Sequence, residues 1–152
     1  MATTITPATD TTRPAPGRGL AWLLLTIGTA VVSDAAAMLV GQRLGRHPFF
    51  ANISPKKTVE GAAAGVLLCV PVMLVGGLYF LGLQPWQAVL LGLLVGVSAE
   101  IGDLVESQMK RLAGVKDSSH IIPGHGGVLD RLDSLLFPPI VVYLFAFFLH
   151  LL

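Results

Sequence analysis

Charge is scarce in this chain of 152 residues. Only 12% of the residues are Asp, Glu, Lys or Arg, about half of the 25% that is typical of soluble domains. Hydrophobic residues make up 53% and the mean hydropathy is +0.74, which excludes an ordinary soluble domain and indicates a membrane protein. The ten basic residues fall in separate segments and form no basic arm, so the net charge of +1 does not point to nucleic acid.

Cysteine is almost absent as well. The only one is Cys69, which lies within an apolar run. A single cysteine excludes an internal disulfide, and apolar neighbours favour a packed thiol over a reactive one. Cys69 therefore says nothing about the compartment in which the protein works.

Charged residues are missing altogether from residues 61–99. A helix of about 20 residues crosses roughly 30 Å of hydrocarbon, so this stretch is too long for one crossing and suits two. Pro85 and Trp86 mark the turn between them, at the membrane interface. Two further apolar runs flank this pair of helices. We expect four spans, at about 19–40, 60–83, 86–105 and 135–152.

The first residues differ from the rest of the chain. Residues 1–18 are rich in Thr, Pro and Ala and show no apolar period, so we expect a flexible tail followed by one membrane domain at 19–152. An alternative treats Arg13 and Arg18 as the flank of a signal peptide that is cleaved at the alanines at 35–37. We disfavour it, because cleavage there would remove part of an acidic motif described below.

Basic residues concentrate in two of the predicted connections. By the positive-inside rule both of these loops are cytoplasmic, while the uncharged connection at 84–86 faces the other side. The predicted fold class is an all-α membrane protein, a bundle of about four transmembrane helices with two basic cytoplasmic loops. The first loop contains Arg43, Arg46, Lys56 and Lys57, and the second contains Lys110, Arg111, Lys116 and Arg131.

Four acids occur where the hydropathy predicts membrane: Asp34, Glu100, Asp103 and Glu106. An ionised group inside a span costs several kcal/mol unless it meets a partner or lines a polar cavity. At 100° per residue the last three lie within an arc of about 120° on one side of the third helix. A helix end emerging into water would account for Glu106, and less readily for Glu100, but not for Asp103, which more apolar residues follow.

A second acidic pair precedes the last span. Asp130 and Asp133 are three residues apart, which on a helix places both carboxylates on one side and turns Arg131 away. Such a concentration of carboxylates favours a hard cation such as Mg²⁺ between them, and Asp103, Asp130 and Asp133 could bind it. Alternatively, the pair caps the last span and binds Arg131 or Arg111; the spacing alone supports both equally.

Basic and glycine-rich segments near these acids suit a phosphate. In SPKKTVEG, Ser54 is a predicted N-cap and Pro55 the first helical residue, so Lys56, Lys57 and free amides would meet at a helix N-terminus. The glycines of PGHGG, 123–127, allow backbone amides to turn toward an anion. Basic groups beside an acidic metal site are typical of phosphoryl and nucleotidyl transferases.

The segment at 107–134, SQMKRLAGVKDSSHIIPGHGGVLDRLDS, resembles the consensus of the phosphatidate cytidylyltransferase family, the CDP-diacylglycerol synthases. It contains the family's Ser, Lys-Arg, Lys-Asp, Pro-x-His-Gly-Gly and Asp-Arg-x-Asp in that order. The blocks SDAAAMLVGQRLGR, ISPKKTVEG and GDLVES are also similar. The resemblance covers about residues 20–152 and corresponds to the family's C-terminal catalytic part. The chain departs from the pattern at Met38, where an aromatic residue is frequent, and at Val59, where Trp is common.

The resemblance implies that CTP and phosphatidate react to give CDP-diacylglycerol and pyrophosphate, with Mg²⁺ as cofactor and K⁺ as a further cation, at the cytoplasmic face of a bacterial inner membrane. It also implies a homodimer, or a partner supplying the additional N-terminal spans that family members usually have. Alternatives are a shortened non-catalytic paralogue acting as a membrane subunit, or an enzyme that activates another lipid phosphate, such as an isoprenoid one. The implied catalytic residues are Asp103, Lys116, Asp117, Asp130 and Asp133; the implied metal ligands are Asp103, Asp130 and Asp133; and the implied substrate-binding residues are Ser54, Lys56, Lys57, Thr58, Lys110, Arg111, His125, Gly126, Gly127 and Arg131.

Overall fold

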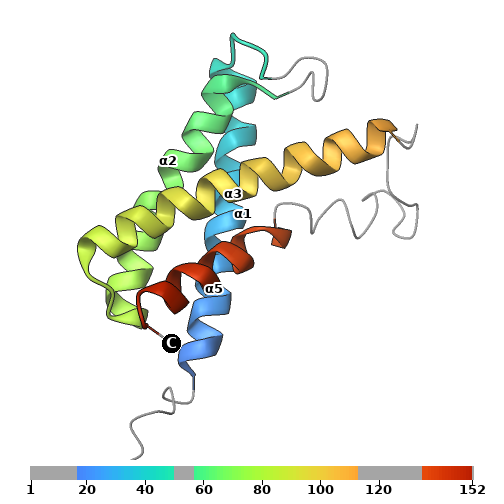
Figure 1. The fold of residues 1–152 in the computed structure, drawn as a ribbon. Coiled ribbons are helices and arrows are strands. Elements are labelled where there is room, and N and C mark those ends of the chain that lie inside the picture. The colour runs from blue at the N-terminus through green and yellow to red at the C-terminus, as the bar shows by residue number, and fades with distance from the viewer. Residues whose placement is uncertain (1–16, 50–56, 113–134, 152) are drawn as a thin grey trace, which may run out of the picture.

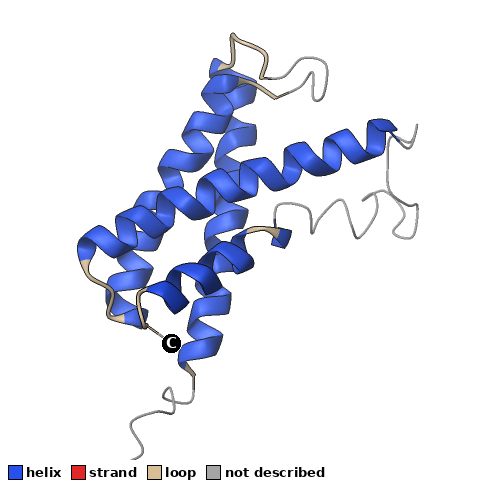
Figure 2. Cartoon of the chain, in the orientation of Figure 1, coloured by secondary structure: helices blue, strands red, loops and turns tan. Residues whose placement is uncertain are grey.

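The computed structural model describes residues 17–49, 57–112 and 135–151 (Figure 1). In these ranges the regular structure is helical and contains no β-strand, apart from an isolated antiparallel bridge between Pro48 and Thr58 (Figure 2). A π-helical turn, η1, continues the second helix. The elements are α1 (Arg18–Leu44), α2 (Val59–Gly76), η1 (Gly77–Leu81), α3 (Pro85–Leu112) and α5 (Pro138–Phe148).

Three helical segments are long and apolar enough to cross a membrane: α1, the continuous segment Val59–Leu81, and α3. Their lengths of 27, 23 and 28 residues exceed the roughly 20 residues that a crossing needs. The prediction of three apolar helices in these parts of the chain is confirmed, and the break between the last two falls at Pro85 as predicted. The predicted end of the third helix at residue 105 is wrong, because α3 continues to Leu112 with basic residues in its last turn.

The fourth helix is shorter than predicted. The sequence predicts a span over 135–152, but α5 has 11 residues and begins at Pro138, where a missing amide donor costs a helix least. It ends because His150 adopts a positive φ of 52° just beyond the C-cap residue Leu149. Eleven residues are too few to cross a bilayer as a helix, so the structure does not confirm a fourth crossing.

Small residues let the helices approach closely. A Cβ atom at Gly92 would lie 2.9 Å from the Cα of Val70, and one at Gly96 would lie 2.8 Å from the Cα of Val66. Glycines at such contacts are typical of membrane bundles, where association depends on close backbone packing. As a result α3 crosses directly over α2, with α1 beside them (Figure 1).

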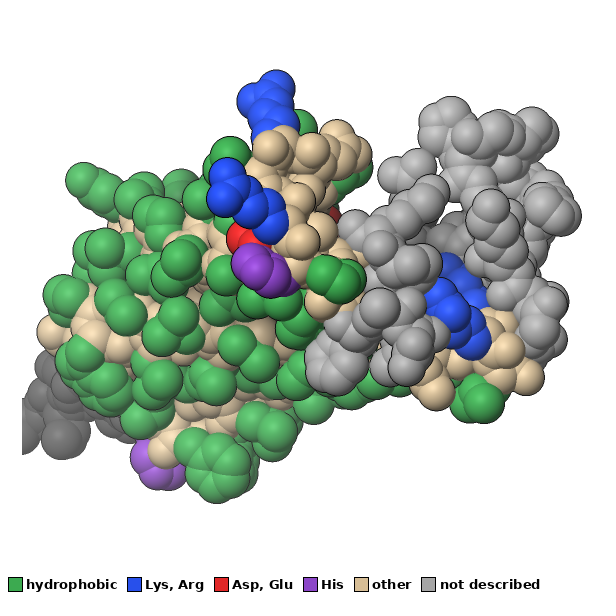
Figure 3. All heavy atoms as spheres, turned by 90° about the horizontal axis from the view of Figure 1, so that it is seen from above, with side chains coloured by type: hydrophobic (Ala, Val, Ile, Leu, Met, Phe, Trp, Pro, Cys, Tyr) green, Lys and Arg blue, Asp and Glu red, His purple; other side chains and the backbone are tan. Residues whose placement is uncertain are grey.

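The apolar core lies where the four helices meet. Its buried members include Trp22 of α1, Met73 of α2, Leu91 of α3 and Phe145 of α5. Many large apolar side chains remain exposed, as a lipid-facing surface requires, and they cover much of the face seen in Figure 3. Basic, acidic and histidine side chains gather in a few places on that face. The charged groups described next belong to one end of the bundle.

Candidate functional site

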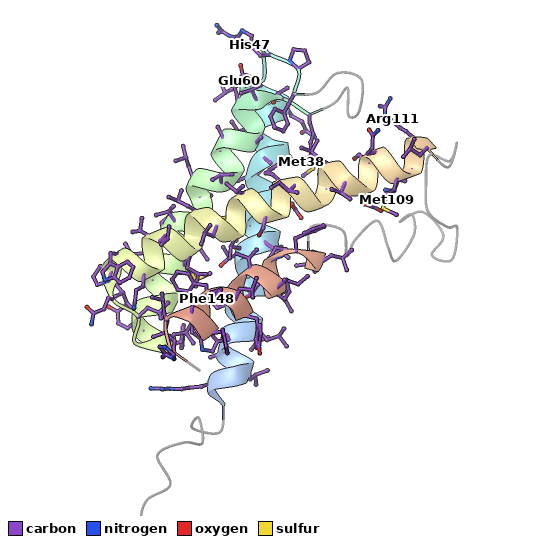
Figure 4. All side chains as sticks on the ribbon, in the orientation of Figure 1. Met38, His47, Glu60, Met109, Arg111 and Phe148 are labelled. Atoms are coloured by element: carbon purple, nitrogen blue, oxygen red, sulfur yellow. The ribbon has the colours of Figure 1, made fainter. Side chains whose placement is uncertain are left out.

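A cavity of about 740 Å³ lies between α1, α3 and the start of α2. This volume is within the range of small-molecule sites, roughly 300–1,000 Å³. The lining includes three carboxylates and two ammonium groups, so it combines both signs of charge within an otherwise apolar bundle. Figure 4 labels one lining residue, Met38, near the crossing of α1 and α3. The lining residues are Asp34, Ala37, Met38, Gly41, Gln42, Lys57, Thr58, Ala62, Glu100, Asp103 and Lys110.

Lys57 reaches into this cavity and binds two acids of α3. Its Nζ lies 2.8 Å from Glu100 Oε2 and 2.5 Å from Asp103 Oδ2. Burial of the ammonium opposes its charge, but the hydrogen bonds and charges of Asp103 and Glu100 outweigh burial and raise the pKa of Lys57 above the ordinary 10.5. Lys57 therefore carries a positive charge at neutral pH.

The backbone of Lys57 is held outside the helices by a short antiparallel pairing. The Phe49 amide donates to the Lys57 carbonyl at 2.7 Å, and the Val59 amide donates to the His47 carbonyl at 3.0 Å. These bonds connect the segment after α1 with the segment before α2. Lys57 is thus anchored at both ends, by its backbone at this pairing and by its ammonium at α3.

A contact between two side chains joins the same two segments. His47 Nδ1 lies 2.6 Å from Glu60 Oε1, and the His47 amide donates to Glu60 Oε2 at 3.3 Å. Figure 4 shows both side chains at the same end of α1 and α2. No sequence pattern predicts this contact, because a separation of 13 positions matches no helical or strand period. Only the return of the chain into α2 brings them together.

The start of α2 differs from the sequence prediction. Val59 is the first helical residue, and Thr58 is the N-cap, whose Oγ1 accepts a hydrogen bond from the Gly61 amide at 3.2 Å. The expectation that Ser54 caps this helix is wrong, since the antiparallel pairing keeps Lys57 and Thr58 extended. Thr58 instead combines capping with a place in the cavity wall, which leaves its hydroxyl proton available to an acceptor there.

Glycines on α1 and α2 make room for this cap. A Cβ atom at Gly41 would lie 3.0 Å from Thr58 Oγ1, and one at Gly45 would lie 2.5 Å from Thr58 Cγ2. On the other side, a Cβ atom at Gly61 would lie 2.5 Å from the Ala37 carbonyl oxygen. The three glycines of the sequence blocks around 34–46 and 54–61, at 41, 45 and 61, are therefore needed for α1 to pack closely on the start of α2.

The prediction of one acidic face on α3 is confirmed. Glu100 and Asp103 bind the same ammonium, and Glu106 lies 2.9 Å from the ammonium of Lys110, which lines the same cavity. Ser107 donates to Asp103 Oδ1 at 3.4 Å. Asp34, the fourth acid that the sequence singles out, lines the cavity from α1. All four acids thus belong to one charged region.

The structure brings together four of the predicted site residues: Lys57, Thr58, Asp103 and Lys110 all line the cavity. Arg111 is exposed near the end of α3 (Figure 4) and is not part of the lining. The remaining predicted residues lie outside the described ranges, so their predicted roles stay predictions. They are Ser54, Lys56, Lys116, Asp117, His125, Gly126, Gly127, Asp130, Arg131 and Asp133.

The predicted metal site extends beyond the described residues. Within 17–49, 57–112 and 135–151, no group of three His, Cys, Asp or Glu side chains could hold a metal ion. Asp103 supplies a carboxylate, the donor type that Mg²⁺ prefers, and it faces a cavity in which a cation, the Lys57 ammonium, already binds it. The donor chemistry therefore fits a hard cation, provided that Asp130 and Asp133 complete the ligand set.

The apolar helices define an integral membrane protein, and a cavity lined by charged residues lies at one end of its bundle. A family model described as "Cytidylyltransferase family" matches residues 3–149, and the chain belongs to this family. Among similar proteins, the phosphatidate cytidylyltransferase of Helicobacter pylori is 45% identical over 130 residues, which are 86% of this chain and 47% of that protein.

Two other relatives have the same name. The phosphatidate cytidylyltransferase of Synechocystis sp. is 46% identical over 132 residues, 84% of this chain and 44% of the relative. That of Mycobacterium tuberculosis is 39% identical over 121 residues, 80% of this chain and 37% of the relative. The chain thus spans less than half the length of the curated relatives that it matches.

Proposed function

We propose that this chain is a membrane nucleotidyltransferase that converts CTP and phosphatidate to CDP-diacylglycerol and pyrophosphate. The family membership and the shared name of its relatives support the substrates. The observation on which the proposal rests in the structure is the Lys57 ammonium, held against Asp103 in a cavity at the end of membrane helices. A diacyl substrate stays in the bilayer, and an ionic site at the ends of the spans lets its phosphate meet soluble CTP.

In the proposed reaction a phosphate oxygen of phosphatidate attacks the α-phosphorus of CTP. A new P–O bond forms there, the bond from the α-phosphorus to the bridging oxygen breaks, and pyrophosphate leaves with that oxygen. Charge on the phosphate oxygens is the main obstacle, so positioned cations are the main contribution of the protein. Lys57 and Lys110 line the cavity, and Thr58 can donate a hydrogen bond to a phosphate oxygen.

The proposed cofactor is Mg²⁺, with K⁺ as a further cation that the resemblance implies. Asp103, Asp130 and Asp133 would hold the divalent ion, which would neutralise charge on phosphate oxygens. Lys116 and Asp117 complete the proposed catalytic set. The remaining proposed substrate contacts come from Ser54, Lys56, Arg111, His125, Gly126, Gly127 and Arg131.

The proposal includes a membrane arrangement. We place the two basic loops on the cytoplasmic side of a bacterial inner membrane, because eight of the ten Lys and Arg residues lie in or beside them: Arg43, Arg46, Lys56 and Lys57 at the first, and Lys110, Arg111, Lys116 and Arg131 at the second. We propose that residues 135–152 form the fourth crossing of a catalytic domain at 19–152, after a flexible tail at 1–18. We also propose that the protein works as a homodimer or with a partner protein that completes the lipid-binding wall.

The test is CDP-diacylglycerol formation by the purified chain in detergent, with CTP and phosphatidate, in the presence and absence of Mg²⁺. Asp130→Asn and Asp103→Asn are the test variants. Ser98→Ala is the matched control, because Ser98 is buried on α3, the helix of Asp103, but donates a hydrogen bond only to the Val95 carbonyl. Metal-dependent product that both Asn variants lose would support the proposal. A folded wild-type protein that prefers an isoprenoid phosphate would overturn the proposed substrate. A folded wild-type protein that forms no product from phosphatidate would overturn the proposal that this chain catalyses the reaction without a partner protein.

A further inference from the structure

Glu100 is an acid that the proposed reaction does not use, although it lies well inside α3. Its side chain is only 9% exposed. Burying a carboxylate costs several kcal/mol unless a partner and hydrogen bonds compensate. The neighbouring Asp103, which lines the same cavity, is more accessible, at 30%, and is the residue of the pair that the proposed reaction uses. A buried second carboxylate one turn away therefore needs its own explanation.

We propose that Glu100 is a positioning residue, which holds the ammonium of Lys57 in the cavity while Asp103 binds substrate or cation. This inference rests on the proposed function, since Asp103 has its second task only in that reaction. Glu100 Oε2 lies 2.8 Å from Lys57 Nζ, the distance of a charge-assisted hydrogen bond. One ammonium shared by two carboxylates keeps a partner when the more exposed carboxylate turns to another ligand.

The packing around Glu100 holds its carboxylate in place from the opposite side. A Cβ atom at Gly65 of α2 would lie 3.1 Å from Glu100 Oε1 and 3.0 Å from Ser33 Oγ. Gly65 thus leaves the space that the carboxylate occupies between α1 and α2. A side chain packed in this way has few alternative positions, whereas the Asp103 side chain, which lines the same cavity, is more exposed.

The two anchors of Lys57 then have separate tasks. The Phe49 amide fixes the Lys57 backbone through its carbonyl oxygen, and Glu100 fixes the ammonium from within the bundle. Between these points the lysine side chain spans from the loop into the cavity. Loss of the Glu100 charge would leave the ammonium dependent on Asp103, the carboxylate that the reaction also needs.

The first measurement is the reactivity of the Lys57 amine, because it requires no enzymatic activity. The wild-type chain, Glu100→Gln and Ser98→Ala are labelled in detergent near pH 9 with an amine-acylating reagent, and each lysine is quantified by mass spectrometry. In Glu100→Gln we expect labelling of Lys57 to rise about tenfold, because the buried carboxylate no longer holds the amine inside the bundle. Labelling of Lys110, which binds Glu106, should not change, and Ser98→Ala should resemble the wild type.

The second measurement is the kinetics of CDP-diacylglycerol formation. We expect kcat/KM for CTP to fall about tenfold in Glu100→Gln, equivalent to about 1.4 kcal/mol of transition-state stabilisation. Glu100→Asp, which retains the charge on a shorter side chain, should recover part of both the kinetic loss and the protection of Lys57. If Glu100→Gln does not fold, Glu100→Asp provides the comparison, with an intermediate increase in Lys57 labelling.

Wild-type reactivity of Lys57 in the folded Glu100 variants would overturn the positioning role, whatever their activity. A wild-type chain that makes no CDP-diacylglycerol would overturn the proposed function instead, and the labelling would show this separately. Activity lost without any change at Lys57 would likewise refute the inference, because it would show that Glu100 acts by another route.

Discussion

Replacing Lys57 with methionine removes the ammonium that Glu100 and Asp103 share, and leaves a side chain of similar length. Breaking a fully buried ion pair costs about 3–5 kcal/mol, because the remaining charge stays buried without its partner. Here Lys57 is 19% exposed and Asp103 is 30% exposed, so solvent screens part of the loss. We expect a destabilisation of about 2–3 kcal/mol, mostly from Glu100.

The same substitution should reduce catalysis more than stability. If Lys57 stabilises charge on the transferring phosphate, its loss should lower kcat about 100-fold, as removal of one preorganised donor does in other enzymes. The measurements are CDP-diacylglycerol formation and thermal unfolding in the same detergent, for Lys57→Met beside Arg43→Met. Arg43 is an exposed cation in the last turn of α1 and does not line the cavity, so its variant controls for loss of one positive charge.

The result that would refute this reasoning is a folded Lys57→Met protein that resembles the wild type in both measurements. Its unfolding midpoint would stay within about 1 °C and its kcat/KM within about twofold of the wild-type values, far below the effects that a broken buried pair produces. A loss of activity with unchanged stability would show that the ammonium contributes to catalysis but not to the packing of α3. Equal effects in Arg43→Met would show that net charge, rather than the cavity, accounts for the change.

Three further outcomes follow from the structure. Gly61→Ala should lower the unfolding midpoint clearly, because its Cβ would meet a backbone carbonyl of α1 at 2.5 Å, whereas Gly28→Ala, where no atom lies within 4 Å, should not; thermal unfolding of both variants tests this. The Lys57 pKa is raised above 10.5, so the contribution of Lys57 to stability should be complete below pH 10.5 and disappear as the pH rises through the higher folded-state value. Between pH 8 and 12 the unfolding midpoint should therefore fall less steeply in Lys57→Met than in the wild type. Removal of divalent ions by EDTA should abolish product formation, and added Mg²⁺ should restore it; activity that survives EDTA would contradict the proposed cofactor.

Much of the bundle could be predicted from the sequence. The run without charges at 61–99 and the turn at Pro85 define two membrane helices, since hydrocarbon admits few charges and requires helical backbone. The helix ends were harder to predict. Ser54 looks like an N-cap, but Thr58 takes that position, with Lys57 paired to Phe49 and Thr58 itself extended. A positive φ at His150 ends the last helix early.

Some features of the candidate site could also be predicted from the sequence, and others could not. The acidic face of α3 followed from helical geometry, because Glu100 and Asp103 are three residues apart on one helix. Their partner could not be predicted, since Lys57 lies 43 residues from Glu100 in the sequence. The contact between His47 and Glu60 was missed for the same reason. Pairs that no helical or strand period relates form only when the elements pack.

By itself, the sequence determined the membrane class, the three long apolar helices and the acids that must share a polar region. These follow from local physics, because hydropathy and helical periodicity depend only on residue order. Tertiary structure decided which cation meets which acid, where α2 begins, and that the Glu100 side chain packs beside Gly65 and is less exposed than that of Asp103, although both line the cavity. These depend on how closely α1, α2 and α3 approach, and that distance is set by glycines whose importance is visible only when the neighbouring helix is in place.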